Sequence, residues 1–200
     1  MKKTVFLDLG NVLVQVKKEI AFREIGRLVK SDTEKIKEQI DWALEQNYET
    51  GKITTSQYIQ ALNKKYGDTQ IFNFENLCDI WAKGFEAIDS AIKLLPQLQK
   101  KVNLYLLSNT NKIHFTAIEQ KFQISKYFCG KILSYEVGLC KPNLSIYRKA
   151  LEIAGTEGEN SYFIDDLEEN LGAAQKLGIH CHQYKQSNSF RNFVSKYSLL

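Results

Sequence analysis

The stretch that decides the fold is VFLDLGNVLV, residues 5–14. It opens with an unbroken apolar run, which is typical of a strand covered on both faces, and Asp8 stands where that strand should end. Gly10 and Asn11 follow two and three residues after it. Ligands of open α/β sheets bind beyond the carboxyl ends of the strands, so Asp8 is the first candidate for a functional residue.

Short runs of β-branched and aliphatic residues with little polar alternation predict the buried strands. They are Thr4–Leu7, Val102–Leu107, Lys131–Ser134, Tyr162–Ile164 and Ile179–His182. Helical periods separate the later runs, over residues 113–122, 146–154 and 171–177, and Gly178 is the expected C′ residue of the last. Because strand and helix alternate, the sequence predicts the α/β class with a Rossmann-like, doubly wound parallel sheet.

The segment from residue 15 to residue 85 is different, because helical periods follow one another there without a convincing strand. Ser31–Glu34 and Thr54–Gln57 have capping-box spacing and predict two helix starts. Pro96 lies inside a helical pattern over residues 90–100 and predicts a bend or break. We therefore expect a core of residues 1–15 and 87–200, with an all-helical cap, residues 16–86, inserted after the first strand.

Composition excludes several classes of protein. The chain has 200 residues, 44% hydrophobic and 25% charged, which suits one globular core with a smaller inserted lobe. Its net charge of +4 comes from scattered lysines, so we expect no nucleic-acid partner. Asp8 interrupts a start that imitates a signal peptide, and no apolar run approaches the ~18 residues of a membrane span. We expect a cytoplasmic protein with no membrane partner.

The cysteines form no CxxC pair and are far apart in the chain, at Cys78, Cys129, Cys140 and Cys181. This spacing favours reduced, mostly buried thiols over zinc ligands or disulfides. His180 and His182 flank Cys181, but they are too few and too local to predict a metal site.

Polar residues at the predicted strand ends supply a coherent chemistry. Ser108 and Asn109 follow one strand, and Asp165 and Asp166 follow another. Two adjacent carboxylates repel one another unless a cation is present, and such hard oxygen ligands suit magnesium. Lys141 precedes a proline, Pro142, which favours an extended backbone and suits the start of a helix; its fixed charge could then face a phosphate. Each feature alone is an ordinary turn or cap, and only their joint order is specific.

That order resembles the haloacid dehalogenase superfamily. The four motifs are DLGNV (residues 8–12), LSNTN (107–111), GLCKP (138–142) and FIDDLEEN (163–170). The chain looks closest to the branch that includes α-D-glucose-1-phosphate phosphatase, also in the segment YETGKITTSQYIQAL (48–62), and more distantly resembles the phosphatase domain of soluble epoxide hydrolase. In that superfamily a helical cap of the C1 type sits where the insert lies here.

The resemblance implies a magnesium-dependent phosphatase that acts on a small phosphorylated metabolite, such as a sugar phosphate or a sugar 1-phosphate. Asp8 would be the nucleophile and would form an aspartyl-phosphate. Magnesium would be held by Asp8, the backbone carbonyl of Gly10 and Asp166, with Asp165 as a direct or water-mediated ligand. Ser108, Asn109 and Lys141 would bind the phosphoryl group, and Asn11 the leaving oxygen. We expect a monomer or a weak dimer.

Gly10 stands where phosphatases of the superfamily typically have a second aspartate, the general acid. One interpretation is that the substrate has a leaving group that needs little protonation. The alternative is that the protein is catalytically silent and serves as a regulatory protein or as a binding protein for a phosphorylated ligand. Haloacid dehalogenation is a third hypothesis, which the paired carboxylates disfavour. His114 could replace the acid, but a helix-surface histidine is the expectation, and Asn47, Tyr48 and Glu49 are the cap residues that could meet a substrate.

Overall fold

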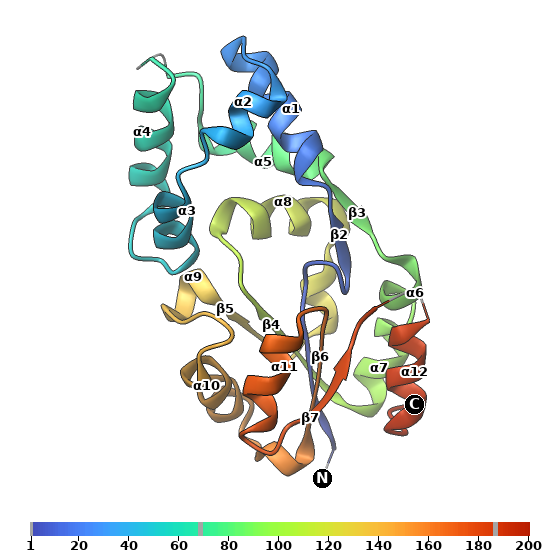
Figure 1. Cartoon of the computed structure of the whole chain (residues 1–200). Helices are drawn as coiled ribbons and strands as arrows, with labels where there is room; N and C mark the ends of the chain where they lie inside the picture. Colours follow the sequence, from blue (N-terminus) through green and yellow to red (C-terminus); the bar gives the residue numbers. More distant parts are fainter. Residues whose placement is uncertain (1, 68–69, 186–187) are drawn as a thin grey trace.

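The computed structural model describes residues 2–67, 70–185 and 188–200, and its centre is a five-stranded sheet. The strand order is β5-β4-β1-β6-β7, and every pairing is parallel (Figure 1). The strands are β1 (Thr4–Leu7), β4 (Asn103–Ser108), β5 (Gly130–Leu133), β6 (Ser161–Asp165) and β7 (His180–Gln183). The predicted doubly wound parallel sheet is confirmed, with strand ends shifted by a residue or so.

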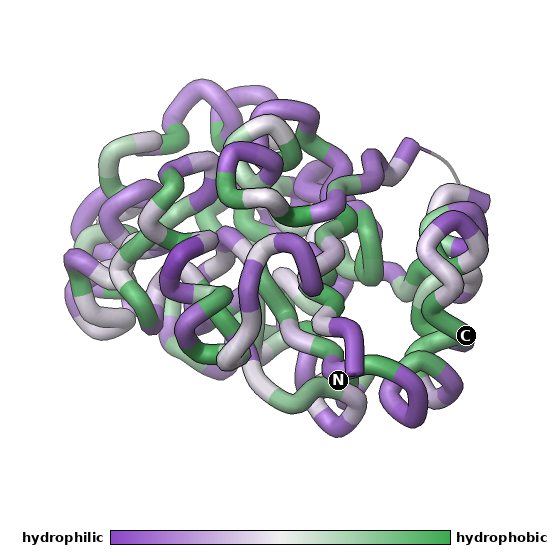
Figure 2. The backbone as a smooth tube through the Cα atoms, turned by 90° about the horizontal axis from the view of Figure 1, so that it is seen from below, coloured by the Kyte–Doolittle hydropathy of each residue, from purple (hydrophilic) through white to green (hydrophobic). Residues whose placement is uncertain are grey.

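The continuous apolarity of the strands follows from two cores, one on each face of the sheet. In β1, Val5 and Leu7 belong to one core, and Phe6, which points the other way, belongs to the second. The first core includes helices α7 (Leu95–Lys101), α8 (Lys112–Phe122) and α12 (Ser189–Lys196), and the second includes α10 (Leu144–Ala154) and α11 (Glu168–Gln175). Apolar segments accordingly run through the interior, and polar ones gather along the outer turns (Figure 2).

The chain reverses its winding direction at β1. From β1 it runs to β4 and β5 on one side of the sheet, and it later returns to β6 and β7 on the other. A crevice therefore opens at the carboxyl end of β1, between its neighbours β4 and β6, which is where doubly wound sheets bind ligands.

Five helices, α1 to α5, form the cap over this end of the sheet (Figure 1). They are α1 (Lys18–Val29), α2 (Thr33–Glu38), α3 (Trp42–Glu49), α4 (Thr55–Lys65) and α5 (Phe74–Lys83). The expectation of no strand in this segment is wrong at its ends, where β2 (Val14–Val16) and β3 (Phe85–Ala87) pair as an antiparallel ribbon. Three-residue strands are too short to show alternation in the sequence. The domain boundaries stay a prediction, and residues 1, 68–69 and 186–187 of those ranges lie outside the described residues.

Local signals set most of the helix starts. The Thr54–Gln57 capping box is confirmed, whereas the side chain of Asp32, not Ser31, caps α2. Pro96 lies in the first turn of α7, after the separate short helix α6 (Asp89–Ile92), so the predicted break is confirmed. Gly178 is not the C′ residue of α11, which already ends at Gln175. In the part of the chain that the structure describes, no helix combines the length and apolarity that a membrane crossing requires.

Candidate active site

Neighbouring strands bring the predicted site residues together. Asp8 follows β1 directly, Ser108 is the last residue of β4, and Asp165 is the last residue of β6. Because β4 and β6 pair with β1 in parallel, their carboxyl ends meet at the same edge. Lys141 reaches this edge from the loop between α9 (Ser134–Val137) and α10. Pro142 lies ahead of α10 rather than in its first turn, because Asn143 caps that helix.

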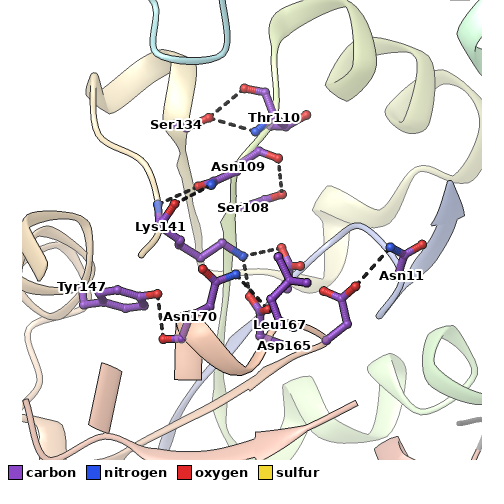
Figure 3. A network of polar contacts seen from close by, with 12 residues as sticks. Asn11, Ser108, Asn109, Thr110, Ser134, Lys141, Tyr147, Asp165, Leu167 and Asn170 are labelled. Carbon is purple, nitrogen blue, oxygen red and sulfur yellow. Dashed lines mark hydrogen bonds and ion pairs between the residues drawn. The ribbon is translucent and has the colours of Figure 1, made fainter. Parts of the chain in front are cut away.

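Lys141 is buried between two carboxylates (Figure 3). Its Nζ lies 2.7 Å from Asp8 Oδ1 and 2.6 Å from Asp165 Oδ2. Burial alone would lower the pKa of Lys141, but Asp8 and Asp165 outweigh it and the pKa is raised. Burial raises the pKa of Asp8 to about 6 despite the opposing effect of Lys141. The lysine is therefore held charged, and Asp8 is an aspartate poorly stabilised by its surroundings.

The two adjacent aspartates differ in their surroundings. Asp165 is fully buried, and its Oδ1 accepts hydrogen bonds from the Leu167 backbone N–H (2.8 Å) and the Asn170 side chain (2.9 Å). Asp166 is half-buried, and its Oδ2 accepts one from Asn11 Nδ2 at 3.1 Å. Both carboxylate oxygens of Asp165 thus already have partners within the protein, whereas Asp166 keeps lone pairs free for another ligand.

The donor set fits a divalent cation. Carboxylate oxygens of Asp8, Asp165 and Asp166 lie within 4.8 Å of one another. Three carboxylates against the one ammonium of Lys141 leave two net negative charges at a largely buried site, and a doubly charged ion would balance them.

Asn109 and Ser108 lie next to Lys141 in the polar network of the site (Figure 3). Asn109 Nδ2 donates to the Lys141 carbonyl, and Asn109 Oδ1 accepts from the Lys141 backbone N–H, both at 2.8 Å. The Asn109 side chain therefore fixes the lysine loop, and contact with a phosphate through its backbone stays a prediction. Ser108 is buried, and among the described residues its Oγ makes only a long 3.4 Å bond to the Asn109 carbonyl, so its hydroxyl remains available.

Sequence reasoning missed two buried supports of the site. Ser134 Oγ accepts from the Thr110 N–H (2.9 Å) and donates to the Thr110 carbonyl (2.8 Å), which ties the end of β5 to the loop after β4. Asn170 holds Asp165 from α11. A signal for Asn170 existed in the sequence, because it closes the FIDDLEEN motif.

We expect Asn170→Ala to lower the free energy of unfolding by about 1–3 kcal/mol, because the buried Asp165 carboxylate would lose a donor. Chemical denaturation of the metal-free protein measures the change. Asn192→Ala, at an exposed position of α12, is the control and should cost far less. Equal losses in the two variants would mean that the Asn170 contact does not support the site.

Gly10 is not required by the backbone. A Cβ built at this position would meet only Val16 Cγ2, at an ordinary contact distance of 3.6 Å, and Gly10 is not among the glycines with positive φ. An alanine Cβ would therefore fit there without backbone strain. Lack of space for a Cβ therefore does not explain why position 10 has no carboxylate.

A cavity of about 350 Å³ lies between the cap and the core. Gly10, Ser108 and Asn109 line it from the core, so it is continuous with the strand-end site. The cap supplies most of the other walls, from helices α1, α3, α4 and α5. A ligand bound at the strand ends would thus extend toward the cap.

His114 lines this cavity, and the expectation of a helix-surface histidine is wrong. Its ring packs on Trp81 with centroids 3.9 Å apart, and its Nδ1 lies 3.3 Å from Asn111 Nδ2. Burial lowers the pKa of His114 to about 3. The imidazole is therefore neutral near pH 7 and cannot replace the missing general acid.

This buried histidine predicts an acid-dependent loss of stability. Unfolding restores the ordinary pKa of 6.5, so below that pH the unfolded chain binds a proton that the folded chain rejects down to about 3. The free energy of unfolding of the wild type should therefore fall as the pH falls. His114→Gln lacks this titration, so between pH 7.5 and pH 5 its free energy of unfolding should rise relative to that of the wild type by on the order of 1–2 kcal/mol. Denaturation at both pH values tests this.

The other residues considered in the sequence differ in whether they line the cavity. Glu49 lines the cavity, whereas Tyr48 is buried with its hydroxyl 3.1 Å from Thr55 Oγ1. His180 and His182 lie on β7, where His180 stacks on Tyr162 at 5.0 Å. All four cysteines are free, as expected, but the expectation that most are buried is wrong, because only Cys78 is and Cys129 is exposed.

The chain is similar to known proteins over most of its length. The haloacid dehalogenase-like hydrolase family matches residues 2–178 of the chain. The chain is 24% identical over 199 residues to a D-ribitol-5-phosphate phosphatase from Bacteroides thetaiotaomicron, and the alignment covers 96% of each protein. It is also 24% identical to a sesquiterpene phosphatase from Aspergillus oryzae, over 88% of this chain and 87% of that protein.

Solved structures agree with the family match. The magnesium complex of a family enzyme from Bacteroides thetaiotaomicron is 29% identical, with a TM-score of 0.78 over 92% of this chain and 93% of its own. A related hydrolase from Porphyromonas gingivalis has the same fold, with a TM-score of 0.83 at 24% identity over 99% and 98% of the two chains. The chain, with its four motifs at the ends of a doubly wound sheet, belongs to the haloacid dehalogenase-like hydrolase family.

Proposed function

We propose that the protein is a magnesium-dependent phosphatase that hydrolyses a small phosphorylated metabolite through an aspartyl-phosphate on Asp8. The observation that carries the proposal is the buried Lys141 ammonium held between Asp8 and Asp165 at the switch point of the sheet. Relatives that match nearly the whole chain are named as phosphatases, which supports the same reaction class here.

Magnesium is the proposed cofactor, and a related enzyme was solved as its magnesium complex. Asp8, Asp166 and the Gly10 carbonyl would hold the ion, because Asp165 is already occupied by Lys141, Leu167 and Asn170. When bound, the ion supplies positive charge that balances the carboxylates and a phosphate ester.

The protein groups divide the chemistry among them. An Asp8 carboxylate oxygen attacks phosphorus, the bond from phosphorus to the ester oxygen breaks, and the leaving group departs with the electron pair. Ser108 and Lys141 hold the phosphoryl oxygens as charge develops, and Asn11 donates a hydrogen bond to the leaving oxygen. Water then attacks the aspartyl-phosphate, which releases phosphate and restores Asp8.

Gly10 restricts the substrates to those with a leaving group that needs little protonation, such as sugar 1-phosphates or acyl phosphates. The resemblance to glucose-1-phosphate phosphatases stays a prediction, and so do the cytoplasmic location, the absence of a nucleic-acid partner and the monomeric or weakly dimeric state. The two relatives named above do not share the organic part of a substrate, because one is named for a polyol phosphate and the other for a sesquiterpene.

The test is phosphate release from acetyl phosphate, α-glucose 1-phosphate and glucose 6-phosphate, first with magnesium and then with a chelator. Acetyl phosphate should turn over fastest, and chelation should stop the reaction. The second candidate, a silent phosphate-binding protein, is favoured only by Gly10. It would show thermal stabilisation by a sugar phosphate with no phosphate release from any compound, and that result would overturn the proposed reaction.

A further inference from the structure

The cavity next to the strand-end site has an aromatic wall. Trp81 is the member that contacts the others: its ring centroid lies 3.9 Å from that of His114, 6.0 Å from that of Phe85, and 6.2 Å from that of Phe22, whose ring is nearly perpendicular to it. All four side chains line the cavity. The His114 ring is neutral near pH 7, so the wall carries no charge. Such a wall offers stacking and edge contacts to a flat ring.

Apolar side chains on the cap helices continue this wall and are only half-buried. They line the cavity from α1, α3 and the end of α4, and comprise Phe22, Ile25, Leu44, Leu62 and Tyr66. Of the charged lining residues, Lys18, Asp41 and Lys65 are exposed and lie toward the mouth, whereas Glu45 and Glu49 are half-buried. The interior of the cavity thus favours an apolar group over a hydroxyl-rich one.

The junction between this cavity and the phosphate site is Gly10, which lines the cavity without offering a proton. Among the described lining residues, the carboxyls are Asp41, Glu45 and Glu49. Asp41 is exposed and caps α3, and Glu45 accepts a 2.6 Å hydrogen bond from Tyr58. Glu49 is half-buried and is the rival proton donor that an experiment has to exclude first.

We propose that the preferred substrates are aryl phosphates, in which a flat, apolar ring occupies the cavity against Trp81 and the departing aryloxide needs no proton from the enzyme. This inference rests on the proposed phosphatase function and names its substrate class. The Asp8–phosphorus bond forms, the bond from phosphorus to the aryl oxygen breaks, and the aryloxide leaves with the electron pair. It takes its proton from solvent. A phenol ionises near pH ~10, so its anion is a far better leaving group than an alkoxide.

The first test measures kcat/KM for a series of substituted phenyl phosphates and for alkyl phosphates such as glucose 6-phosphate, all with magnesium. Without a proton donor, the rate should fall steeply as the leaving oxygen becomes more basic, and alkyl esters should be at least ~100-fold slower than phenyl phosphate. Glu49→Gln should leave the slope unchanged. A shallow slope in the wild type that steepens in Glu49→Gln would overturn the inference, because Glu49 would then be the acid.

The second test asks whether the cavity holds the ring. Ile25→Asn makes the wall polar, and Leu28→Asn is its control on the same helix, at a position that is exposed and outside the lining. Ile25→Asn should raise KM for 2-naphthyl phosphate about 10-fold, the scale of a lost apolar contact, and leave acetyl phosphate unchanged. Leu28→Asn should change neither.

The two proposals fail in different ways. Metal-dependent hydrolysis of acetyl phosphate with no preference for 2-naphthyl phosphate over α-glucose 1-phosphate overturns the aryl inference and keeps the phosphatase. Loss of hydrolysis for every compound, acetyl phosphate included, overturns both. Equal effects of Ile25→Asn on 2-naphthyl phosphate and acetyl phosphate also contradict the inference, because the variant would then act on the phosphate site.

Discussion

Asp8→Asn is expected to lower kcat by at least about 10⁴-fold for every phosphate ester, because an amide cannot attack phosphorus and no other group can take over. The buried Lys141 keeps a carboxylate partner in Asp165, so the variant should still fold. Phosphate release with magnesium measures the loss, and thermal unfolding checks the fold.

The same variant tests the covalent intermediate directly. Wild-type protein quenched with acid during turnover of a radiolabelled substrate should retain label on the chain, and Asp8→Asn should retain none. Asp79→Asn, an exposed aspartate on α5 outside the cavity, is the control and should behave as wild type. Activity of Asp8→Asn within tenfold of wild type would mean that water attacks phosphorus without the aspartate.

The fold and the order of the site could be predicted because their signals are local. Each strand of the five-stranded sheet carries its own apolar run, and Asp8, Ser108 and Asp165 lie at the ends of three of them, whereas Lys141 lies in a loop. The strand order then brings these residues together, because the carboxyl ends of β1, β4 and β6 lie side by side when parallel strands pair in this order. Asp8, Ser108 and Asp165 needed no knowledge of side-chain packing to be placed together.

The parts that could not be predicted depend on contacts between distant segments. The ribbon of β2 and β3 forms only because the two ends of the cap meet, and neither three-residue strand has a pattern of its own. The neutral state of His114 depends on its burial, and part of the cover comes from Trp81, which lies on a different helix and packs on its ring. The division of labour between Asp165 and Asp166 likewise appears only once Asn170 and Asn11 are in place.

Gly10→Asp is expected to raise kcat/KM for alkyl phosphates by about 10² to 10⁴-fold, the usual contribution of a general acid. The position lines the cavity, and a Cβ there would meet only Val16 Cγ2 at 3.6 Å, so there is room for the Cβ of the new side chain. Aryl and acyl phosphates should gain little, because their leaving groups need no proton.

Gly10→Ala separates this effect from a change in the backbone, because it adds the Cβ without the carboxyl group. It should leave the rates for alkyl and aryl phosphates near those of wild type. If Gly10→Asp accelerates both classes equally, the new carboxylate acts on metal binding or on the phosphate rather than on the leaving group. If it accelerates neither while folding normally, a proton already reaches the leaving oxygen from elsewhere, and Glu49 in the cavity wall becomes the group to replace next.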